Sequence, residues 1–181
     1  NIGDYPSATS VFDVDAIGLV RILGRFNEGR DLAGYSLKVK AGFTIACAFN
    51  PLARDLPAEK DRLRRKADAG AHVVYTQPVF GADQVDVCVQ AAREVGLPVL
   101  VGLLPLRNAR HAEFMANEVP GIEIPADLLR RMLDAPDDAS ALALGMEEAC
   151  ALAARIRTDA QGLYVMPPAG KPDLAATLMA V

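Results

Sequence analysis

The sequence predicts an α/β fold with a parallel sheet, because two observations coincide along the chain. Four apolar segments typical of buried strands each run into Pro or a polar residue followed by Pro, and helical patterns separate one segment from the next. Strand-helix-strand units at this spacing form right-handed crossovers, which make neighbouring strands parallel. The predicted strands cover 43–49, 73–77, 98–104 and 162–166.

Helical patterns fill the intervals between these strands and also precede the first one. Asp15 stands directly before an apolar run, where its carboxylate suits a helix N-cap, so we predict a first helix over 14–26. Residues 1–42 then form a helix and a loop that lead into four strand-helix units over 43–181, all in one domain. Later helices are predicted over 58–69, 82–95, 109–118 and 139–156, with a last one from Asp173.

Composition narrows the class of protein. A hydrophobic content of 51% in 181 residues supplies a core for one globular domain. The net charge of −4 argues against a general nucleic-acid surface, which needs a basic stripe. No apolar run reaches the roughly 18 residues that span a bilayer, and the start of the chain has no signal-peptide pattern. We therefore expect a cytoplasmic protein that binds neither membranes nor nucleic acids.

Cysteine and histidine give no pattern of metal ligands or redox chemistry. Cys47, Cys88 and Cys150 lie in apolar strand or helix patterns without CxxC spacing, so we interpret them as small buried hydrophobic residues. His72 and His111 are far apart in the sequence and have no supporting carboxylate motif. We expect no metal site.

The run RLRRKADAGAHVVYTQPVF combines a basic helix, a glycine turn and an apolar strand. Gly70 can take the positive φ that ends a helix, and the strand that follows delivers Thr76 and Gln77 at its carboxyl end. Parallel α/β enzymes hold ligands at that end of the sheet. The residues alone leave two interpretations open: these polar groups bind a ligand, or they cap the strand while the helix cations face water.

Six motifs, taken in order, resemble the 5,10-methylenetetrahydrofolate reductase family. Three are short, AFNP, GLLPL and GLYVMPP, while KADAGAHVVYTQPVF and NEVPGIEIP are the most specific. A long element that begins GDYPSATSVFDVDAIG precedes them, so the resemblance covers nearly the whole chain. The sequence looks closest to the reductase module of bifunctional bacterial enzymes that also carry a homocysteine S-methyltransferase module.

The resemblance implies a TIM-type (β/α)8 barrel with FAD across the carboxyl ends of the strands. NADH or NADPH would reduce the flavin, which would pass hydride to 5,10-methylenetetrahydrofolate and yield 5-methyltetrahydrofolate. By position, Ala48 and Asn50 match contacts to the flavin nucleotide, and Gln77 matches a glutamine that touches the pterin ring or the nicotinamide. The positions expected to hold ribose and pyrophosphate are Glu59, Arg62 and Lys66, on one helical face.

The family pattern also predicts what this chain lacks. It holds four of the eight expected strands, the second half of the barrel, so the general-acid glutamate of the first strand is outside it. We assign no catalytic residue, and we place Asp4 of GDYP in a turn. Asn50 stands where some relatives have an aromatic residue, and Ala109 where several place one against folate.

An incomplete barrel leaves strand edges unpaired. We therefore expect the chain to form homo-oligomers, to bind the missing half of the barrel, or to cover its sheet with the helix over 14–26. Three functions are compatible with the sequence: part of a flavin-dependent methylenetetrahydrofolate reductase, another barrel enzyme for a pterin or phosphate ligand such as a methyltransferase, and a non-catalytic half-barrel that acts through association. Flavin binding that depends on Arg62 and Lys66 distinguishes the first from the others.

Overall fold

The computed structural model describes residues 13–167 and 171–181. The GDYP element with Asp4 lies outside these ranges, as does Pro168. In the described part, four parallel strands form one sheet in the predicted order along the chain. The strands are Ala46–Phe49 (β1), Val73–Val79 (β2), Val99–Leu103 (β3) and Gly162–Val165 (β4).

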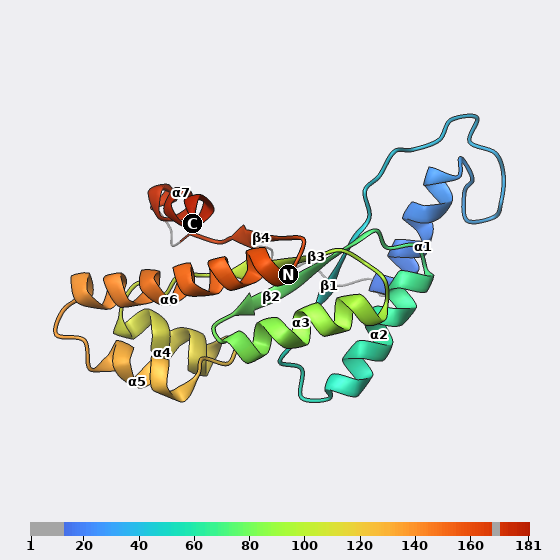
Figure 1. The fold of residues 1–181 in the computed structure, drawn as a ribbon. Coiled ribbons are helices and arrows are strands. Elements are labelled where there is room, and N and C mark those ends of the chain that lie inside the picture. Colours follow the sequence, from blue (N-terminus) through green and yellow to red (C-terminus); the bar gives the residue numbers. More distant parts are fainter. Residues whose placement is uncertain (1–12, 168–170) are drawn as a thin grey trace, which may run out of the picture.

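Helices connect the strands, as the alternation of strand and helix patterns predicted. They lie along one face of the sheet (Figure 1). One helix joins β1 to β2, a second joins β2 to β3, and three lie between β3 and β4. The N-cap prediction for Asp15 is confirmed, because its carboxylate accepts a hydrogen bond from the Gly18 amide at 2.7 Å. The helices are Ala16–Asn27 (α1), Leu56–Asp68 (α2), Ala82–Glu94 (α3), Ala109–Glu118 (α4), Ala126–Leu133 (α5), Asp138–Asp159 (α6) and Pro172–Ala180 (α7).

Helix α5 was not predicted. Its eight residues follow Pro125 and turn Leu128 and Met132 into the core, where they pack with α4 and α6. A segment of two turns gives too few repeats for a periodic signal, and such a short helix depends on tertiary packing for its stability.

The core lies between the sheet and its helices and consists of two apolar clusters. The larger one is centred on Phe49, Leu63, Val74 and Val101, all at most 1% exposed. A second cluster fills the space among α4, α5 and α6 beyond the carboxyl ends of the strands. This second cluster fixes the loops that follow β2 and β3. Its buried members are Phe80, Leu106, Ala112, Met115, Ile124, Leu128, Met132 and Ala141.

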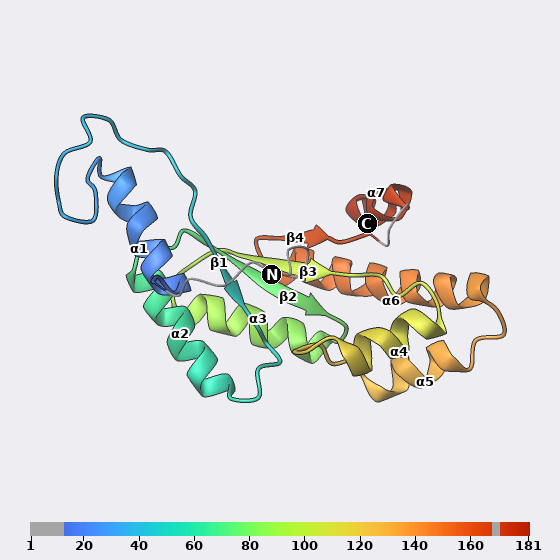
Figure 2. The ribbon, with the colours of Figure 1, turned by 180° about the vertical axis from the view of Figure 1, so that it is seen from behind.

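The opposite face of the sheet is open. Along β1, Cys47 and Phe49 are buried against the helices, whereas Ala48 is exposed on the other side. Tyr75 and Gln77 continue this exposed row on β2. No helix of the described ranges covers this face (Figure 2). Ala48, Tyr75 and Gln77 therefore form an exposed surface on this side of the sheet.

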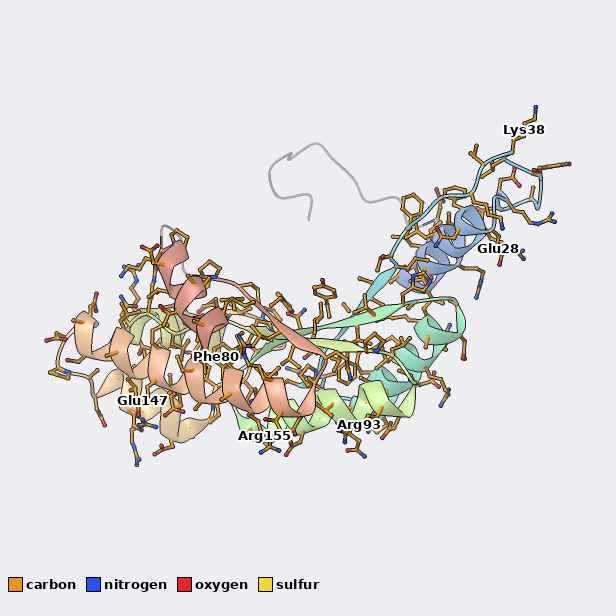
Figure 3. All side chains as sticks on the ribbon, turned by 45° about the horizontal axis from the view of Figure 1, so that its top comes forward. Glu28, Lys38, Phe80, Arg93, Glu147 and Arg155 are labelled. Carbon is orange, nitrogen blue, oxygen red and sulfur yellow. The ribbon has the colours of Figure 1, made fainter. Side chains whose placement is uncertain are left out.

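Helix α1 does not cover the open face, so that expectation is wrong. It packs against α2, where Val20 joins the core beside Ile45. The loop over 28–43 then extends away from the sheet, with Glu28 at its start and Lys38 toward its far end (Figure 3). The first strand begins at Ala46 rather than at residue 43, because this loop occupies the intervening residues.

Strand β2 continues past Thr76 and Gln77, which were predicted to end it. The ladder with β3 shifts register between Tyr75 and Pro78, so two residues of β2 stand opposite one residue of β3. This bulge is the place where a strand accepts proline, which has no N–H for the ladder. The prediction therefore placed Thr76 and Gln77 on the correct strand, but it was wrong that the strand ends there, because these residues form a bulge within it.

Among residues 13–167 and 171–181, no helix is both long enough and apolar enough to cross a membrane.

Candidate functional site

The carboxyl end of β1 and the helix that follows it form the candidate site. Asp55 caps α2 by accepting a hydrogen bond from the Ala58 amide at 3.0 Å, which fixes where the helix begins. Leu63, fully buried, then holds α2 against the sheet. With this anchor, Glu59 and Lys66 lie on the buried side of the helix, with 7% and 8% of their surfaces exposed.

Both of these side chains bond to the outer edge of β1. The Ile45 carbonyl accepts hydrogen bonds from the amides of His72 and Val73, so the backbone groups of Ile45 point toward β2. The direction of the backbone groups alternates from one residue of a strand to the next, so the carbonyl of Ala48 and the amide of Asn50 point away from β2. The Lys66 ammonium donates from Nζ to the Ala48 carbonyl oxygen at 2.7 Å. The Asn50 amide donates to Glu59 Oε1 at 3.2 Å. Helix α2 thus satisfies two edge groups that would otherwise be unpaired.

Arg62 completes this cluster on its solvent side. Its Nε and one terminal nitrogen donate to Glu59 Oε2 at 2.8 and 2.6 Å, and its side chain is 52% exposed. The sequence prediction that Glu59, Arg62 and Lys66 share one face of the helix is therefore confirmed. Two cations and one carboxylate give the cluster a net positive charge of one, beside backbone groups at a strand end.

The donor set fits the anionic part of a nucleotide. Arg62 carries five N–H donors and Lys66 three, and the hydrogen bonds described here use only some of them. The exposed edge of the Arg62 guanidinium is open to a phosphate oxygen, for which arginine supplies charge-assisted bonds. Glu59 orients that guanidinium while it holds the start of the β1-α2 loop.

Asn50 opens onto a hollow that sequence reasoning did not identify. The hollow measures about 470 Å³ and lies between the β1-α2 loop and residues 116–123, which are the last residues of α4 and the loop that follows it. Gly121 adopts φ +81°, and a Cβ there would come within 2.6 Å of Asn50 Nδ2. The close approach explains the glycine in NEVPGIEIP. A Pro-Gly pair is typical of turns, but nothing in the sequence indicates that this one meets Asn50.

We call Ala48, Asn50, Glu59, Arg62 and Lys66 the α2 cluster. Gln77 lies apart from it. The β1-β2 ladder pairs Phe49 with Thr76, so Gln77 is one residue further along, level with Asn50, and its side chain is exposed on the open face. The structure therefore brings Ala48, Asn50, Glu59, Arg62 and Lys66 together through direct hydrogen bonds, and leaves Gln77 on the neighbouring strand. No hydrogen bond from the Gln77 side chain occurs within the described residues.

Both histidine side chains accept hydrogen bonds from backbone amides. His72 Nδ1 accepts from the Ile45 amide at 3.1 Å, and His111 Nδ1 accepts from the Arg107 amide at 3.3 Å. Burial, with a smaller contribution from the Arg107 charge, lowers the pKa of His111 below its usual range. Across residues 13–167 and 171–181, no three metal-ligating side chains gather in one place.

Two cysteines are buried as predicted. Cys88 is fully buried, and desolvation raises its pKa to about 12. Burial also raises the pKa of Cys47, beneath the α2 cluster, against the opposing effect of the Lys66 charge. Cys150 is only partly buried, so the prediction is too strong for this residue. At neutral pH, burial therefore keeps Cys47 and Cys88 as thiols.

Comparisons with known proteins agree with the family resemblance of the sequence motifs. The family model described as methylenetetrahydrofolate reductase matches residues 14–166. A Caenorhabditis elegans protein named "Probable methylenetetrahydrofolate reductase (NADPH)" is 31% identical over 133 residues, which cover 70% of this chain and 19% of that protein. The 5,10-methylenetetrahydrofolate reductase of Escherichia coli K12 is 29% identical over 140 residues, which cover 75% of this chain and 43% of that protein. The chain thus spans less than half the length of either relative.

A solved structure is similar in fold. It is a Clostridium thermocellum protein described as uncharacterized and as binding two copies of 5-methyl-5,6,7,8-tetrahydrofolic acid. The TM-score is 0.52 at 17% identity, over 79% of this chain and 54% of that one. At this identity the likeness concerns the fold alone. The family model, by contrast, spans most of the sequence and includes every residue of the α2 cluster, so the chain belongs to the methylenetetrahydrofolate reductase family.

Proposed function

We propose that this chain forms part of a flavin-dependent enzyme that reduces 5,10-methylenetetrahydrofolate to 5-methyltetrahydrofolate with NADH or NADPH. One observation carries the proposal: the five residues that the family resemblance assigns to the flavin nucleotide meet at the carboxyl end of β1 through direct hydrogen bonds. The names of the two reductase relatives support the reaction. The solved neighbour, described as binding 5-methyltetrahydrofolate, supports a folate ligand.

In this proposal the α2 cluster binds the cofactor through its nucleotide. FAD supplies the hydride transfer itself when bound. Arg62 and Lys66 bind the pyrophosphate, and Glu59 holds Arg62 in place and accepts from the start of the β1-α2 loop. Ala48 and Asn50 line the strand end against the nucleotide.

Gln77 is proposed to bind the folate. Its amide can both donate to and accept from the edge of a pterin ring. Its exposed side chain is level with Asn50, so a pterin bound there would lie beside the cofactor site. In the half-reaction with NADH or NADPH, the same amide would meet the nicotinamide.

The whole reaction needs more protein than these four strands. We propose that they are the second half of a (β/α)8 barrel, completed by four further strands of a longer enzyme or by association of chains. The open sheet face, with Ala48, Tyr75 and Gln77 exposed, supports this proposal. The general acid then belongs to the other half, and a homocysteine S-methyltransferase module is a further expected partner of the reductase module.

A flavin titration with two matched arginine variants tests the cofactor site. Arg62 and Arg64 each pair with a carboxylate three residues earlier on α2, but only Arg62 belongs to the cluster at β1. We expect Arg62→Ala to weaken FAD binding at least tenfold, the loss of about one charge-assisted hydrogen bond, and Arg64→Ala to change it less than twofold. Equal effects of the two variants, or no FAD binding by the unmodified chain at high micromolar concentration, would contradict the proposal.

A further inference from the structure

The bulge in β2 has an unusual set of hydrogen bonds, centred on the Thr76 hydroxyl. At the bulge, Thr76 and Gln77 stand opposite one residue of β3, so the regular ladder cannot satisfy every backbone group there. The Gly102 amide of β3 donates to Thr76 Oγ1 at 3.0 Å instead of to a carbonyl. The same hydroxyl donates to the Gln77 carbonyl oxygen at 2.8 Å. One buried side chain, 3% exposed, thus replaces two ladder partners.

Tyr164 of β4 secures the other carbonyl of the bulge. Its hydroxyl donates to the Thr76 carbonyl oxygen, across the full width of β3. Gly102 makes this crossing possible, because a Cβ at that position would lie 2.8 Å from Tyr164 Oη. The Tyr164 ring also packs on Tyr75, with centroids 5.2 Å apart. Tyrosine, glycine and threonine on three adjacent strands therefore form one connected unit.

This unit fixes the direction of Gln77. A bulge rotates the residues within it relative to the regular pleat, and its geometry is set by where its carbonyls bond. Here both bulge carbonyls are held by side-chain hydroxyls. Burial alternates regularly from Val74 to Gln77, with Thr76 in the core and Gln77 on the open face, and the alternation breaks only after Gln77, where Pro78 and Val79 are both buried. The hydroxyl bonds therefore hold the bulge at this point of the strand. Without these bonds, the bulge could move one residue toward the start of β2, and such a one-residue shift reverses the face on which the Gln77 side chain lies.

We infer that Thr76, supported by Gly102 and Tyr164, is a positioning residue that presents the Gln77 amide to the folate. The inference rests on the proposed role of Gln77 as a folate ligand. Thr76 itself is buried in the core, so its side chain does not reach the open face of the sheet. Its effect on the site passes entirely through the backbone of its neighbour.

Titrations of the full chain with 5-methyltetrahydrofolate and, separately, with FAD test the inference. Thr76→Val keeps the shape of the side chain and removes both hydroxyl bonds, while Thr76→Ser keeps them. We expect Thr76→Val to weaken 5-methyltetrahydrofolate about tenfold, with FAD affinity within twofold, and Thr76→Ser to restore folate affinity. Tyr164→Phe, which removes one bond and preserves packing, should give a smaller loss in the same direction. A Thr76→Val protein that loses both ligands equally would overturn the inference.

Amide hydrogen exchange provides a readout that does not depend on any ligand. In Thr76→Val we expect the Gly102 amide to exchange at least tenfold faster and the Gln77 side-chain amide resonances to move, whereas amides of α2 stay unchanged. Unchanged Gly102 exchange and unchanged Gln77 resonances would overturn the positioning role. If the unmodified chain binds no folate, the proposed function fails, and the exchange data still decide whether Thr76 sets the direction of Gln77.

Discussion

Lys66 donates a hydrogen bond to the carbonyl oxygen of Ala48 at 2.7 Å, although only 8% of the lysine surface is exposed. A buried ammonium is costly unless it is paired, and here its partner is a backbone carbonyl at the outer edge of a strand. The same bond satisfies a carbonyl that points away from the rest of the sheet. Lys66 is therefore both a structural residue at the edge of β1 and a proposed cofactor ligand.

A pair of lysine variants separates these two roles from general effects of charge. Lys66→Met keeps the aliphatic stem but leaves the Ala48 carbonyl unbonded, so we expect it to lower the free energy of unfolding by about 1–3 kcal/mol. Lys60 on the same helix pairs with Glu94 near the surface, at 2.9 Å. Lys60→Met should therefore change stability by less than about 1 kcal/mol. Urea denaturation measures both, and a Lys66→Met protein as stable as the unmodified chain would refute the structural role.

Two glycines within helices should respond oppositely to alanine. At Gly145 of α6, a Cβ would lie 2.0 Å from the Leu106 carbonyl oxygen, whereas at Gly24 of α1 the nearest such atom is 3.5 Å away. We expect Gly145→Ala to cost about 1–3 kcal/mol through overpacking. Gly24→Ala should instead stabilise the protein by about 0.5–1 kcal/mol, because alanine loses less backbone entropy. Thermal or urea denaturation of the two variants, with changes of the same sign, would show that α6 does not approach the β3 loop this closely.

Stability should fall as the pH drops below about 6.5, partly because of His111. Burial lowers the pKa of His111 in the folded state from the ordinary 6.5, so the unfolded chain takes up a proton first. The protonated ring can no longer accept the Arg107 amide. The contribution of His111 is thus complete above pH 6.5, decreases as the pH falls, and is constant below the folded pKa. Unfolding free energies at pH 5 and pH 8 should differ less in His111→Gln than in the unmodified chain, and an equal difference would exclude this cause.

Alkylation should distinguish the cysteines. Cys88 is fully buried and has a pKa of about 12. Its thiolate fraction at pH 8 is therefore about 10⁻⁴, even where the reagent can reach the sulfur. Cys150 is partly exposed on α6. We expect iodoacetamide to modify Cys150 first and Cys88 only as fast as the protein opens, as peptide mass spectrometry can follow. Comparable labelling rates in the native protein would show that the core around Cys88 is not closed.

Sequence patterns predicted most of the helices and strands because these elements depend on residues that are close together in the sequence. The bounds of α4 are those predicted, and the N-cap at Asp15 follows from a polar residue before an apolar run. The family resemblance named Glu59, Arg62 and Lys66, and their spacings of three and four predicted that they lie on one side of a helix.

What escaped prediction depends on contacts between distant segments. The bulge in β2 exists because Gly102 and Tyr164, far along the chain, bond to Thr76, and no pattern within VVYTQPV reports those partners. In the same way, the approach of Gly121 to Asn50 comes from the packing of α4 and α5. Family resemblance could name these residues, but only the fold shows which of them touch.

The hydroxyl of Tyr164 also imposes an order on how the site is completed. β4 follows β1 and α2 along the chain, so during synthesis it leaves the ribosome after every residue of the α2 cluster. The Thr76 carbonyl acquires its partner only when β4 docks beside β3. A nascent chain can therefore assemble the proposed nucleotide site well before Gln77 is fixed, so the capacity to hold a cofactor matures earlier than the capacity to recognise a substrate.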